Sequence, residues 1–315
     1  MFDLLVGTDI RFPNLGITLN NVGKNVSVFG FKIAFYGMII VTGMILGTVI
    51  ACMQAKRTGQ KVDTYEDFAL YAIISAILGA RIYYVIFYWQ SYADNPISVF
   101  DIRSGGLAIY GGVIGGIICA LCFCRIKKIK VPLFLDTCSV GLLTGQVIGR
   151  WGNFFNREAF GKYTDNLLAM QLDLRDVSYN YRCDLSVLKA EYEGKPEALA
   201  NIIKIRDNIV TVNGAQYIQV TPTFLYESLW NLILLVVILC YAPHKKFDGE
   251  MILMYFGFYG LGRFWIEALR TDQLFLWNTG IAVSQLLSAI LAVSSITIII
   301  IMRIKIARKS KSKKV

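Results

Sequence analysis

Charged residues and histidine are both scarce in this sequence. Only 17% of its 315 residues are charged, and the single histidine, His244, lies in a basic loop where we expect it to be solvated. Three cysteines fall between positions 119 and 124, but within an apolar stretch with no histidine nearby, so we interpret them as small apolar residues. The sequence therefore indicates neither a metal site nor a cofactor.

Several familiar motifs are also missing. The chain has no GxxxxGK[ST] and no GxGxxG sequence, which excludes a soluble nucleotide-binding fold of either kind. Residues 1–28 have no basic segment ahead of an apolar stretch, and this predicts that no signal peptide is cleaved. Six of the seven cysteines lie in or beside apolar stretches and Cys183 stands alone, so a disulfide framework is not indicated.

Long apolar stretches are what the chain has in abundance. Apolar residues make up 55% of it, and the mean hydropathy is +0.52. Runs of about 20 apolar residues match the ~30 Å hydrocarbon core of a bilayer, whereas a barrel shows short alternating strands. The sequence thus predicts an all-α integral membrane protein with seven transmembrane helices, at about 29–53, 65–88, 105–124, 132–151, 224–241, 250–269 and 280–302.

The net charge of +10 is placed where it sets membrane topology and gives no indication of nucleic-acid binding. Sixteen Lys and Arg residues flank the ends of the first, third, fifth and seventh helices, whereas the opposite short links hold only Arg103 and Arg270. The positive-inside rule then puts the N-terminus outside and the C-terminus in the cytoplasm. This predicts five regions: an extracytoplasmic segment 1–28, helices one to four in 29–152, an extracytoplasmic head in 153–220, helices five to seven in 221–302, and a basic cytoplasmic tail in 303–315.

The polar stretch from Gly149 to Gly161 follows the fourth apolar run directly. Arg150 lies at the predicted membrane edge, with Asn153 and Glu158 close behind it. A charge at membrane depth costs about 2.5–3.5 kcal/mol on insertion scales and usually faces a partner or a water-filled cavity. We therefore predict that this stretch forms the floor of a site for an anionic group.

A second polar group lies on the sixth predicted helix. Tyr259, Arg263 and Glu267 are spaced by four and share one helix face, level with Arg150 at the outer membrane edge. One interpretation is an Arg–Glu pair that neutralises itself between helices. The other is that Arg150 and Arg263 together hold a phosphodiester, whose oxygens accept the planar guanidinium group.

Further polar or flexible residues have both structural and functional interpretations. Gly105 and Gly106 open the third predicted helix, where bare backbone N–H groups can meet a phosphate, while glycines spaced by four along that helix favour close helix packing. Arg81 is either a structural ion pair or a ligand of an anion, and Tyr36 fits an aromatic belt equally well. Glu227 lies in the first turn of the fifth helix, where it can interact with the helix dipole.

These residues carry a resemblance to a known family. The stretch from Gly149 to Gly161 resembles the signature of the bacterial prolipoprotein diacylglyceryl transferases. Further matching blocks follow in the family's order: 35–37, 79–81, 105–112, 222–227 and 259–270. The resemblance covers all but the extreme ends and the region 165–215.

The resemblance implies a defined reaction and a set of site residues. It implies transfer of the sn-1,2-diacylglyceryl group of phosphatidylglycerol to the lipobox cysteine of a prolipoprotein signal peptide, with a thioether formed and glycerol phosphate released. It places the protein in the bacterial cytoplasmic membrane as a multi-pass enzyme. We predict catalytic roles for Arg150, Arg263, Tyr110 and Glu267, and substrate binding by Tyr36, Arg81, Gly105, Gly106, Asn153, Glu158, Gly161 and Tyr259.

Two positions depart from the family pattern. Many relatives have histidine at the positions of Tyr110 and Thr221, and the first of these has been assigned as the base. A thiol with a pKa near 8.5 needs little help to ionise beside two arginines, so a specific general base is not required. We predict that Tyr110 positions the nucleophile.

Two other functions are compatible with the same residues. A multi-pass transporter of an anionic solute would line its path with arginines, but such proteins usually show repeated halves and broken helices at the bilayer midplane, and the sequence has neither sign. Another phospholipid head-group transferase would differ only in its acceptor.

Overall fold

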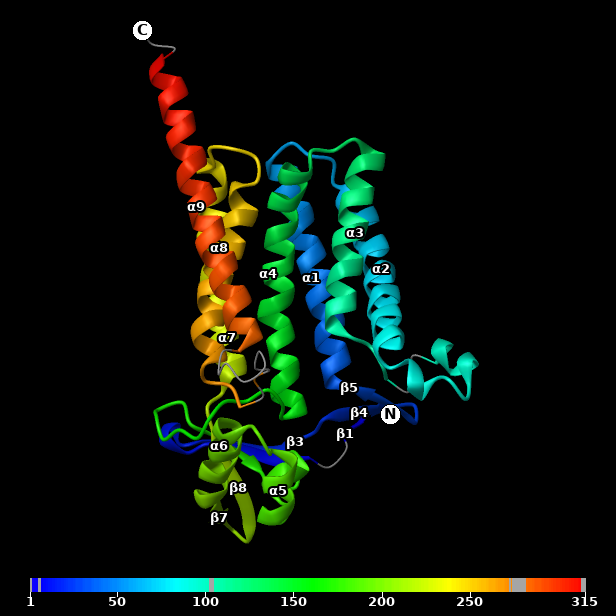
Figure 1. Cartoon of the computed structure of the whole chain (residues 1–315), viewed down its shortest axis with the longest axis vertical. Coiled ribbons are helices and arrows are strands. Elements are labelled where there is room, and N and C mark those ends of the chain that lie inside the picture. Colours follow the sequence, from blue (N-terminus) through cyan, green and yellow to red (C-terminus); the bar gives the residue numbers. More distant parts are fainter. Residues whose placement is uncertain (1, 5–6, 102–104, 272, 274–281, 313–315) are drawn as a thin grey trace. The chain divides into compact units, whose positions relative to one another are not determined.

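The computed structural model describes residues 2–4, 7–101, 105–271, 273 and 282–312 (Figure 1). Its long helices are α1 (Phe35–Arg57), α2 (Asp63–Phe87), α3 (Ile109–Lys127), α4 (Val131–Asn156), α7 (Thr223–Tyr241), α8 (Glu250–Glu267) and α9 (Val283–Ser312). Each of them overlaps one predicted transmembrane helix. The main difference is at α9, which continues as a helix through most of the basic tail.

Six of the described helices are long and apolar enough to cross a bilayer: α1, α2, α3, α4, α7 and α9. This confirms a helical, multi-pass membrane protein. The remaining long helix, α8, is not among the six, since its 18 residues include the charged side chains Glu250, Arg263 and Glu267. A seventh span and the orientation of the chain therefore stay predictions.

The chain forms two compact units, which are described separately. Unit 1 comprises Met1–Leu46, Leu142–His244 and Leu253–Val315, and unit 2 comprises Gly47–Gly141 and Lys245–Ile252. The predicted site residues divide between them. Tyr36 and the residues numbered from 150 upward belong to unit 1, whereas Arg81, Gly105, Gly106 and Tyr110 belong to unit 2.

In unit 2 the glycines of α3 allow α2 to approach closely, as the spacing predicted. A Cβ atom on Gly115 would meet the backbone of Ser75, and one on Gly111 would overlap the backbone of Gly79. Only this face is tight, because a Cβ on Gly116 would have no neighbour within 4 Å. The small residues therefore serve helix packing.

A buried carboxylate in unit 2 fixes the start of α8. Asp136, on α4, accepts hydrogen bonds from the backbone N–H groups of Gly249 at 2.9 Å and Ile252 at 3.0 Å, and from Lys245 Nζ at 3.1 Å. The first N–H groups of a helix have no partner within the helix, so an acceptor from another segment stabilises this end. α4 and α8 are thus joined by a side-chain cap.

Unit 1 contains strands that the sequence analysis did not predict. The described strands are β1 (Phe2–Leu4), β2 (Thr8–Phe12), β3 (Ile17–Val22), β4 (Asn25–Val28), β5 (Phe31–Ala34), β6 (Met170–Asp173), β7 (Val210–Val212) and β8 (Ala215–Val220). They form a three-stranded sheet, β1-β4-β5, and a five-stranded sheet, β3-β2-β6-β8-β7. The all-α prediction thus holds for the membrane helices, while two small sheets are added outside them.

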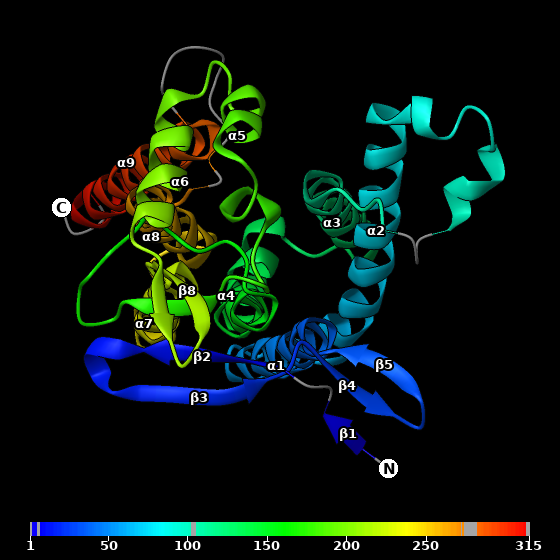
Figure 2. The same ribbon diagram turned by 90° about the horizontal axis from the view of Figure 1, so that it is seen from below.

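The five-stranded sheet joins the N-terminal segment to the predicted head region. Strand β2, which lies beside β3 in Figure 2, pairs antiparallel with β6, and β6 pairs with β8. Ile10, Leu172 and Ile218 therefore form one row across three strands. All three side chains are at most 1% exposed. This row anchors a hydrophobic core that also includes Phe154 and Phe224, at the ends of α4 and α7.

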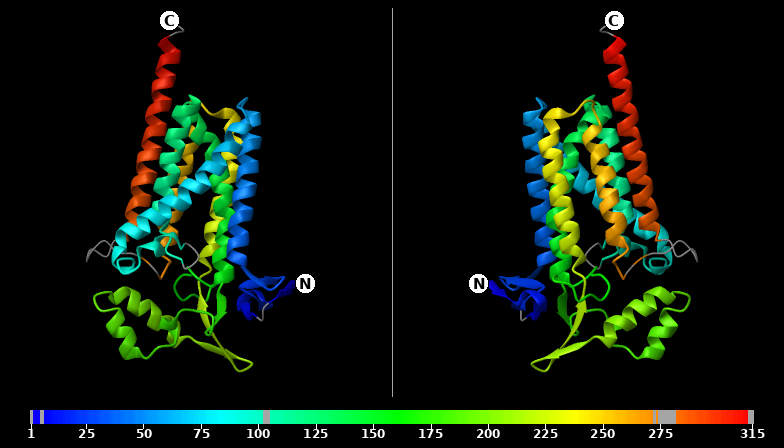
Figure 3. Two further views of the ribbon diagram at one scale, coloured as in Figure 1. Left: turned by 90° about the vertical axis from the view of Figure 1, so that its right-hand side faces the viewer. Right: turned by 90° about the vertical axis from the view of Figure 1, so that its left-hand side faces the viewer.

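Two short helices complete the head, α5 (Leu185–Glu191) and α6 (Pro196–Asp207). The two helices are separated at Gly194, whose φ of 77° suits glycine, and Pro196 begins α6. Within unit 1, these helices and the β7–β8 hairpin lie at the end remote from the C-terminus (Figure 3).

Candidate functional site

Five charged side chains of unit 1 form one cluster, which we call the arginine cluster: Arg150, Arg263, Arg270, Glu227 and Glu267. Glu227 links the helices, because its Oε2 lies 2.6 Å from Arg150 Nη2 and its Oε1 accepts a hydrogen bond of 2.8 Å from Arg263 Nη1. Glu267 lies 2.5 Å from Arg263 Nη2. Arg270 approaches both carboxylates, at 3.6 Å and 3.9 Å.

Burial differs between the two kinds of side chain in the arginine cluster. Both carboxylates are only 4% exposed, whereas the arginine side chains are 22%, 17% and 12% exposed for Arg150, Arg263 and Arg270. Buried carboxylates are stable only when paired, and here the guanidinium groups supply the pairing. Three arginines and two glutamates leave a formal charge of +1, located on the more accessible groups.

Local sequence brings these groups together. Arg263 and Glu267 are one turn apart on α8, so that they lie on the same face, as predicted. Glu267 is held further by Ser284, whose hydroxyl donates to it at 2.6 Å. The interpretation of a neutralising Arg–Glu pair is therefore correct for Arg263 and Glu267, but Glu227 adds a connection to Arg150 on α4.

The spacing of α7 and α8 is set by an aromatic side chain against a glycine. Trp230 of α7 donates from Nε1 to the carbonyl of Phe258 at 2.9 Å, and its indole packs on Gly262, where a Cβ atom would overlap the ring. Gly262 directly precedes Arg263. Close approach at this point brings α8 within reach of Glu227.

Two predicted tyrosines lie near the arginine cluster, Tyr259 on α8 and Tyr36 on α1. Tyr259 stacks on Tyr255 with ring centroids 5.4 Å apart, and the Tyr255 hydroxyl accepts a 2.8 Å hydrogen bond from Gln146, one turn before Arg150. Tyr36 of α1 packs against Gly152, where a Cβ atom would come within 2.7 Å of its ring. Tyr36 and Tyr259 therefore border the cluster without forming part of its ion pairs.

The predicted polar stretch 149–161 forms the last turns of α4 and a tight loop after it. Asn153 and Asn156 both donate to Oε1 of Glu158, at 3.1 Å and 3.2 Å. Arg157 is buried, and desolvation lowers its pKa while Asp176, 3.2 Å away, acts in the opposite direction. Gly161 bridges to Arg270, and a Cβ there would come within 2.6 Å of the carbonyl oxygen of Leu269. Gly161 thus fastens this loop to the end of α8.

Thr221, where many relatives have histidine, also fastens the loop. Its backbone N–H and its hydroxyl both donate to the carbonyl of Lys162, at 3.0 Å and 2.9 Å. Its own carbonyl accepts from the N–H of Gly161 at 2.9 Å. The side chain of Thr221 therefore adds a second hydrogen bond to the same carbonyl that its backbone already holds.

Arg81 in unit 2 is occupied by the protein itself. Its five N–H donors bond to the carbonyls of Ser98, Val99, Asp101, Gly105 and Gly106 at 2.7–3.0 Å. These bonds use the whole donor capacity of a guanidinium group. Among the described residues these carbonyls are its hydrogen-bond partners, so Arg81 holds residues 98–101 and 105–106 against α2, and its binding of an anion stays a prediction.

Gly105 and Gly106 also differ from their predicted role. Helix α3 begins at Ile109, so the two glycines precede it and are not its first N–H donors. Both have positive φ, 94° and 76°, and both offer carbonyls to Arg81. Tyr110 follows in the first turn of α3, is 52% exposed, and lies 6.5 Å from the ring of Tyr83.

Glu227 and Arg270 are the site residues that sequence reasoning missed. Glu227 was interpreted through the helix dipole and Arg270 through topology alone. The available signal was burial, since a glutamate in the first turn of an apolar helix needs a cation nearby. Among the described residues, no three His, Cys, Asp or Glu side chains gather as a metal site requires.

The family model described as prolipoprotein diacylglyceryl transferase matches residues 24–301. Proteins named phosphatidylglycerol–prolipoprotein diacylglyceryl transferase are similar over most of the chain. The one from Enterococcus faecalis is 39% identical, covering 91% of this chain and 94% of its own length. Those from Streptococcus agalactiae serotype Ia and Clostridioides difficile are 40% and 38% identical, covering 87% and 79% of this chain and 93% and 84% of their own lengths.

Proposed function

This chain belongs to the prolipoprotein diacylglyceryl transferase family, and from that membership we propose how the arginine cluster carries out the family's reaction. The protein is a transferase of bacterial lipoprotein maturation that moves a diacylglyceryl group. Its substrates are phosphatidylglycerol and a prolipoprotein. The acceptor in our proposal is the thiol of the lipobox cysteine.

The phosphate of phosphatidylglycerol binds at Arg150 and Arg263. The supporting observation is that these two guanidinium groups, from α4 and α8, already share one buried carboxylate, Glu227. A carboxylate and a phosphate present similar acceptor oxygens to a guanidinium fork, and arginine can serve both in parallel. Glu227 holds the two forks in place, and their more exposed edges receive the lipid.

The charge of the arginine cluster suits this ligand. Its formal charge of +1 equals in magnitude the single negative charge of a phosphodiester. During transfer a phosphate monoester is released and negative charge grows on the leaving oxygens. Preorganised cations at that position stabilise the transition state more than the ground state, which is usually the largest catalytic contribution.

The bond changes balance without a covalent enzyme intermediate. The cysteine sulfur attacks the glyceryl carbon that carries the phosphate, a C–S bond forms, and the C–O bond to phosphate breaks with its electron pair on the oxygen. The thiol proton passes to the released glycerol phosphate or to water. A thiolate forms readily near cations, because they lower the pKa of a thiol.

The other predicted residues have supporting roles in this proposal. Asn153 and Glu158 orient the lipid head group, and Tyr36 and Tyr259 border it. Glu267 keeps Arg263 in position, Gly161 holds the loop after α4 to α8, and Tyr110 positions the thiol by donating a hydrogen bond. Arg81, Gly105 and Gly106 act one step away, by shaping the loop that precedes Tyr110.

The membrane placement is also part of the proposal. The protein lies in the bacterial cytoplasmic membrane with seven spans, the N-terminus and the head outside, and the basic end of α9 in the cytoplasm. The asymmetry of basic residues in short flanks supports this orientation. The arginine cluster then faces the side on which secreted precursors emerge.

The test is a transfer assay with purified protein. The protein is mixed with phosphatidylglycerol and a lipobox peptide in detergent, and the peptide mass is measured. We expect a gain of one diacylglyceryl unit on the cysteine and equimolar glycerol phosphate. A Cys→Ser peptide is the matched control. Absence of the mass gain with active Enterococcus faecalis enzyme run in parallel contradicts the proposal.

A further inference from the structure

A polar pocket lies in the head, beside the loop that follows α4. Its volume of about 330 Å³ falls at the lower end of the range for ligand pockets, which is roughly 300–1,000 Å³. Residues of unit 1 line it: 156–160, part of the segment 176–181, Tyr192 after α5, Ile202 of α6, and Thr271. Of these residues, the reaction proposed above uses only Glu158.

The pocket and the arginine cluster share two loops. Glu158 lines the pocket and belongs to the stretch that begins at Arg150, while Thr271 lines it and follows Arg270 directly. The two loops are joined, since Gly161 pairs with Arg270 and the N–H of Lys162 donates to the carbonyl of Leu269 at 2.8 Å. A ligand in the pocket is therefore a neighbour of the reacting groups.

The polar groups of the pocket complement a peptide group. Asn180 donates from Nδ2 to the Tyr192 hydroxyl at 2.7 Å, so that this hydroxyl keeps its own hydrogen to donate and Oδ1 of Asn180 can accept. Burial raises the pKa of Tyr192, and the phenol stays protonated at neutral pH. Phe160 and Ile202 supply an apolar wall. One donor and one acceptor match a backbone C=O and N–H.

The charge of the lining argues against a small anion. Arg157 is matched by Asp176, whose Oδ2 lies 3.2 Å from its Nε and also accepts from Thr8 at 2.5 Å. Lys24 Nζ lies 3.5 Å from Oδ1 of the same carboxylate. With the exposed carboxylate of Glu158, these four charges sum to zero. The cation among the lining residues, Arg157, is already paired, so a phosphate finds no unpaired cation there, whereas a neutral polypeptide needs none.

We propose that this pocket binds the extended stretch of the prolipoprotein that follows its reactive cysteine. This inference rests on the proposed function, because it assumes a cysteine delivered to the arginine cluster. The stretch that follows the cysteine lies outside the bilayer, as does the head in the proposed topology. Recognition through backbone groups tolerates different side chains, and one enzyme can then serve many precursors.

The test compares two peptides of different length. Both carry the same lipobox segment, but one ends at the cysteine as an amide and the other continues for eight neutral polar residues. Three variants are compared with wild type: Asn180→Trp fills the pocket, Tyr192→Phe removes a single oxygen, and Tyr179→Trp is the control on an exposed neighbour outside the lining. KM is measured for each peptide and for phosphatidylglycerol.

We expect wild type to bind the long peptide about tenfold more tightly than the short one, the equivalent of one or two hydrogen bonds. Asn180→Trp should abolish this difference, Tyr192→Phe should reduce it, and Tyr179→Trp should preserve it, with the KM for phosphatidylglycerol unchanged throughout. If wild type has the same KM for both peptides, or if Tyr192→Phe changes the KM of both peptides equally, the pocket does not bind this stretch.

Binding measured without turnover separates this inference from the reaction. Both peptides carry an amino-terminal fluorophore, and anisotropy is recorded in detergent without phosphatidylglycerol. A length-dependent affinity that Tyr192→Phe weakens supports the pocket even if no diacylglyceryl is transferred, in which case the proposed reaction fails alone. Normal transfer with equal affinities for the two peptides overturns the pocket alone.

Discussion

Replacing Glu227 with glutamine probes the centre of the arginine cluster. Glutamine has nearly the same shape but no charge, and it places an NH₂ group where one carboxylate oxygen was. In the native protein the Glu227 carboxylate lies 2.6 Å from Arg150 and 2.8 Å from Arg263. In the variant, one of these two arginines faces the NH₂ donor of glutamine in place of an acceptor oxygen. The cluster changes from a formal charge of +1 to +2.

Two effects of different size follow from this change. Removing one partner of a buried ion pair costs about 3–5 kcal/mol, and the partial exposure of the arginines, 12–22%, places Glu227→Gln near the lower value. Loss of one oriented donor at a developing negative charge costs about 10²–10³-fold in kcat. We therefore expect a folded but less stable protein whose transfer rate falls at least a hundredfold.

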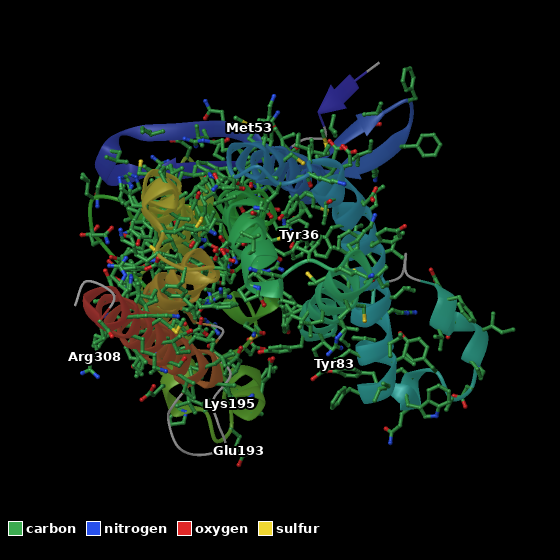
Figure 4. The ribbon with its side chains drawn as sticks, turned by 90° about the horizontal axis from the view of Figure 1, so that it is seen from above. Tyr36, Met53, Tyr83, Glu193, Lys195 and Arg308 are labelled. Carbon is green, nitrogen blue, oxygen red and sulfur yellow. The ribbon has the colours of Figure 1, made fainter. Side chains whose placement is uncertain are left out.

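The assay measures thermal unfolding and diacylglyceryl transfer on the same preparation. Glu193→Gln is the matched control, because this exposed glutamate of the head undergoes the same chemical change (Figure 4). Glu227→Asp keeps the charge and should recover part of the rate. A Glu227→Gln protein within threefold of wild-type rate would refute the idea that this carboxylate orients the two arginines.

Three further results are expected. Arg150→Lys should be nearly as inactive in the transfer assay as Arg150→Ala, because an ammonium group cannot hold carboxylate and phosphate together; a rate within a few-fold of wild type would contradict the clamp. Tyr110→Phe should lower kcat about 10- to 100-fold, the loss of one hydrogen bond, whereas a loss beyond a thousandfold would indicate that proton transfer occurs there. Burial raises the pKa of Asp173, but hydrogen bonds from Arg175 outweigh it and the net pKa is lowered. Ionised Asp173 therefore stabilises the folded protein above about pH 4, and this stabilisation is lost as the pH falls through its lower pKa in the folded state. The unfolding free energy of Asp173→Asn should therefore fall less than that of wild type between about pH 7 and 3. An unchanged pH dependence would contradict this role of Asp173.

The membrane helices and three of the five residues of the arginine cluster could be predicted from local sequence. Apolar length alone defines a span, because the bilayer thickness fixes how many residues are needed. Arg150, Arg263 and Glu267 could be found because they are charged residues at the ends of apolar helices, with a spacing of four between the last two. These signals need no knowledge of tertiary structure.

The strands of unit 1 could not be predicted in the same way. β2 and β6 are only five and four residues long, and they pair across about half of the chain. Such short segments carry little periodicity, and their hydrogen-bond partners are distant in sequence. The sequence therefore predicts residues 1–28 only as an extracytoplasmic segment, although Ile10 and Phe12 lie in the core of the head.

Arg81 shows a different limit of sequence reasoning. An arginine within an apolar helix predicts a partner, but its sequence does not say whether that partner is an anion or the backbone. Here the loop 98–106 supplies five carbonyl oxygens, which together satisfy a guanidinium group without any negative charge. How many carbonyl oxygens a loop turns toward one arginine depends on its folded conformation, which the sequence alone does not give.

Glu227 also explains how the proposed phosphate site can be stable without a phosphate. Two arginines facing each other at the end of apolar helices would repel, and the free energy of that repulsion would oppose folding. The buried carboxylate of Glu227 between them removes most of the repulsion, while the whole cluster keeps a formal charge of +1. A third carboxylate facing Arg150 would bring this charge to zero and weaken the attraction for a phosphodiester. Two glutamates against three arginines therefore keep the empty site folded and still favour an anionic lipid.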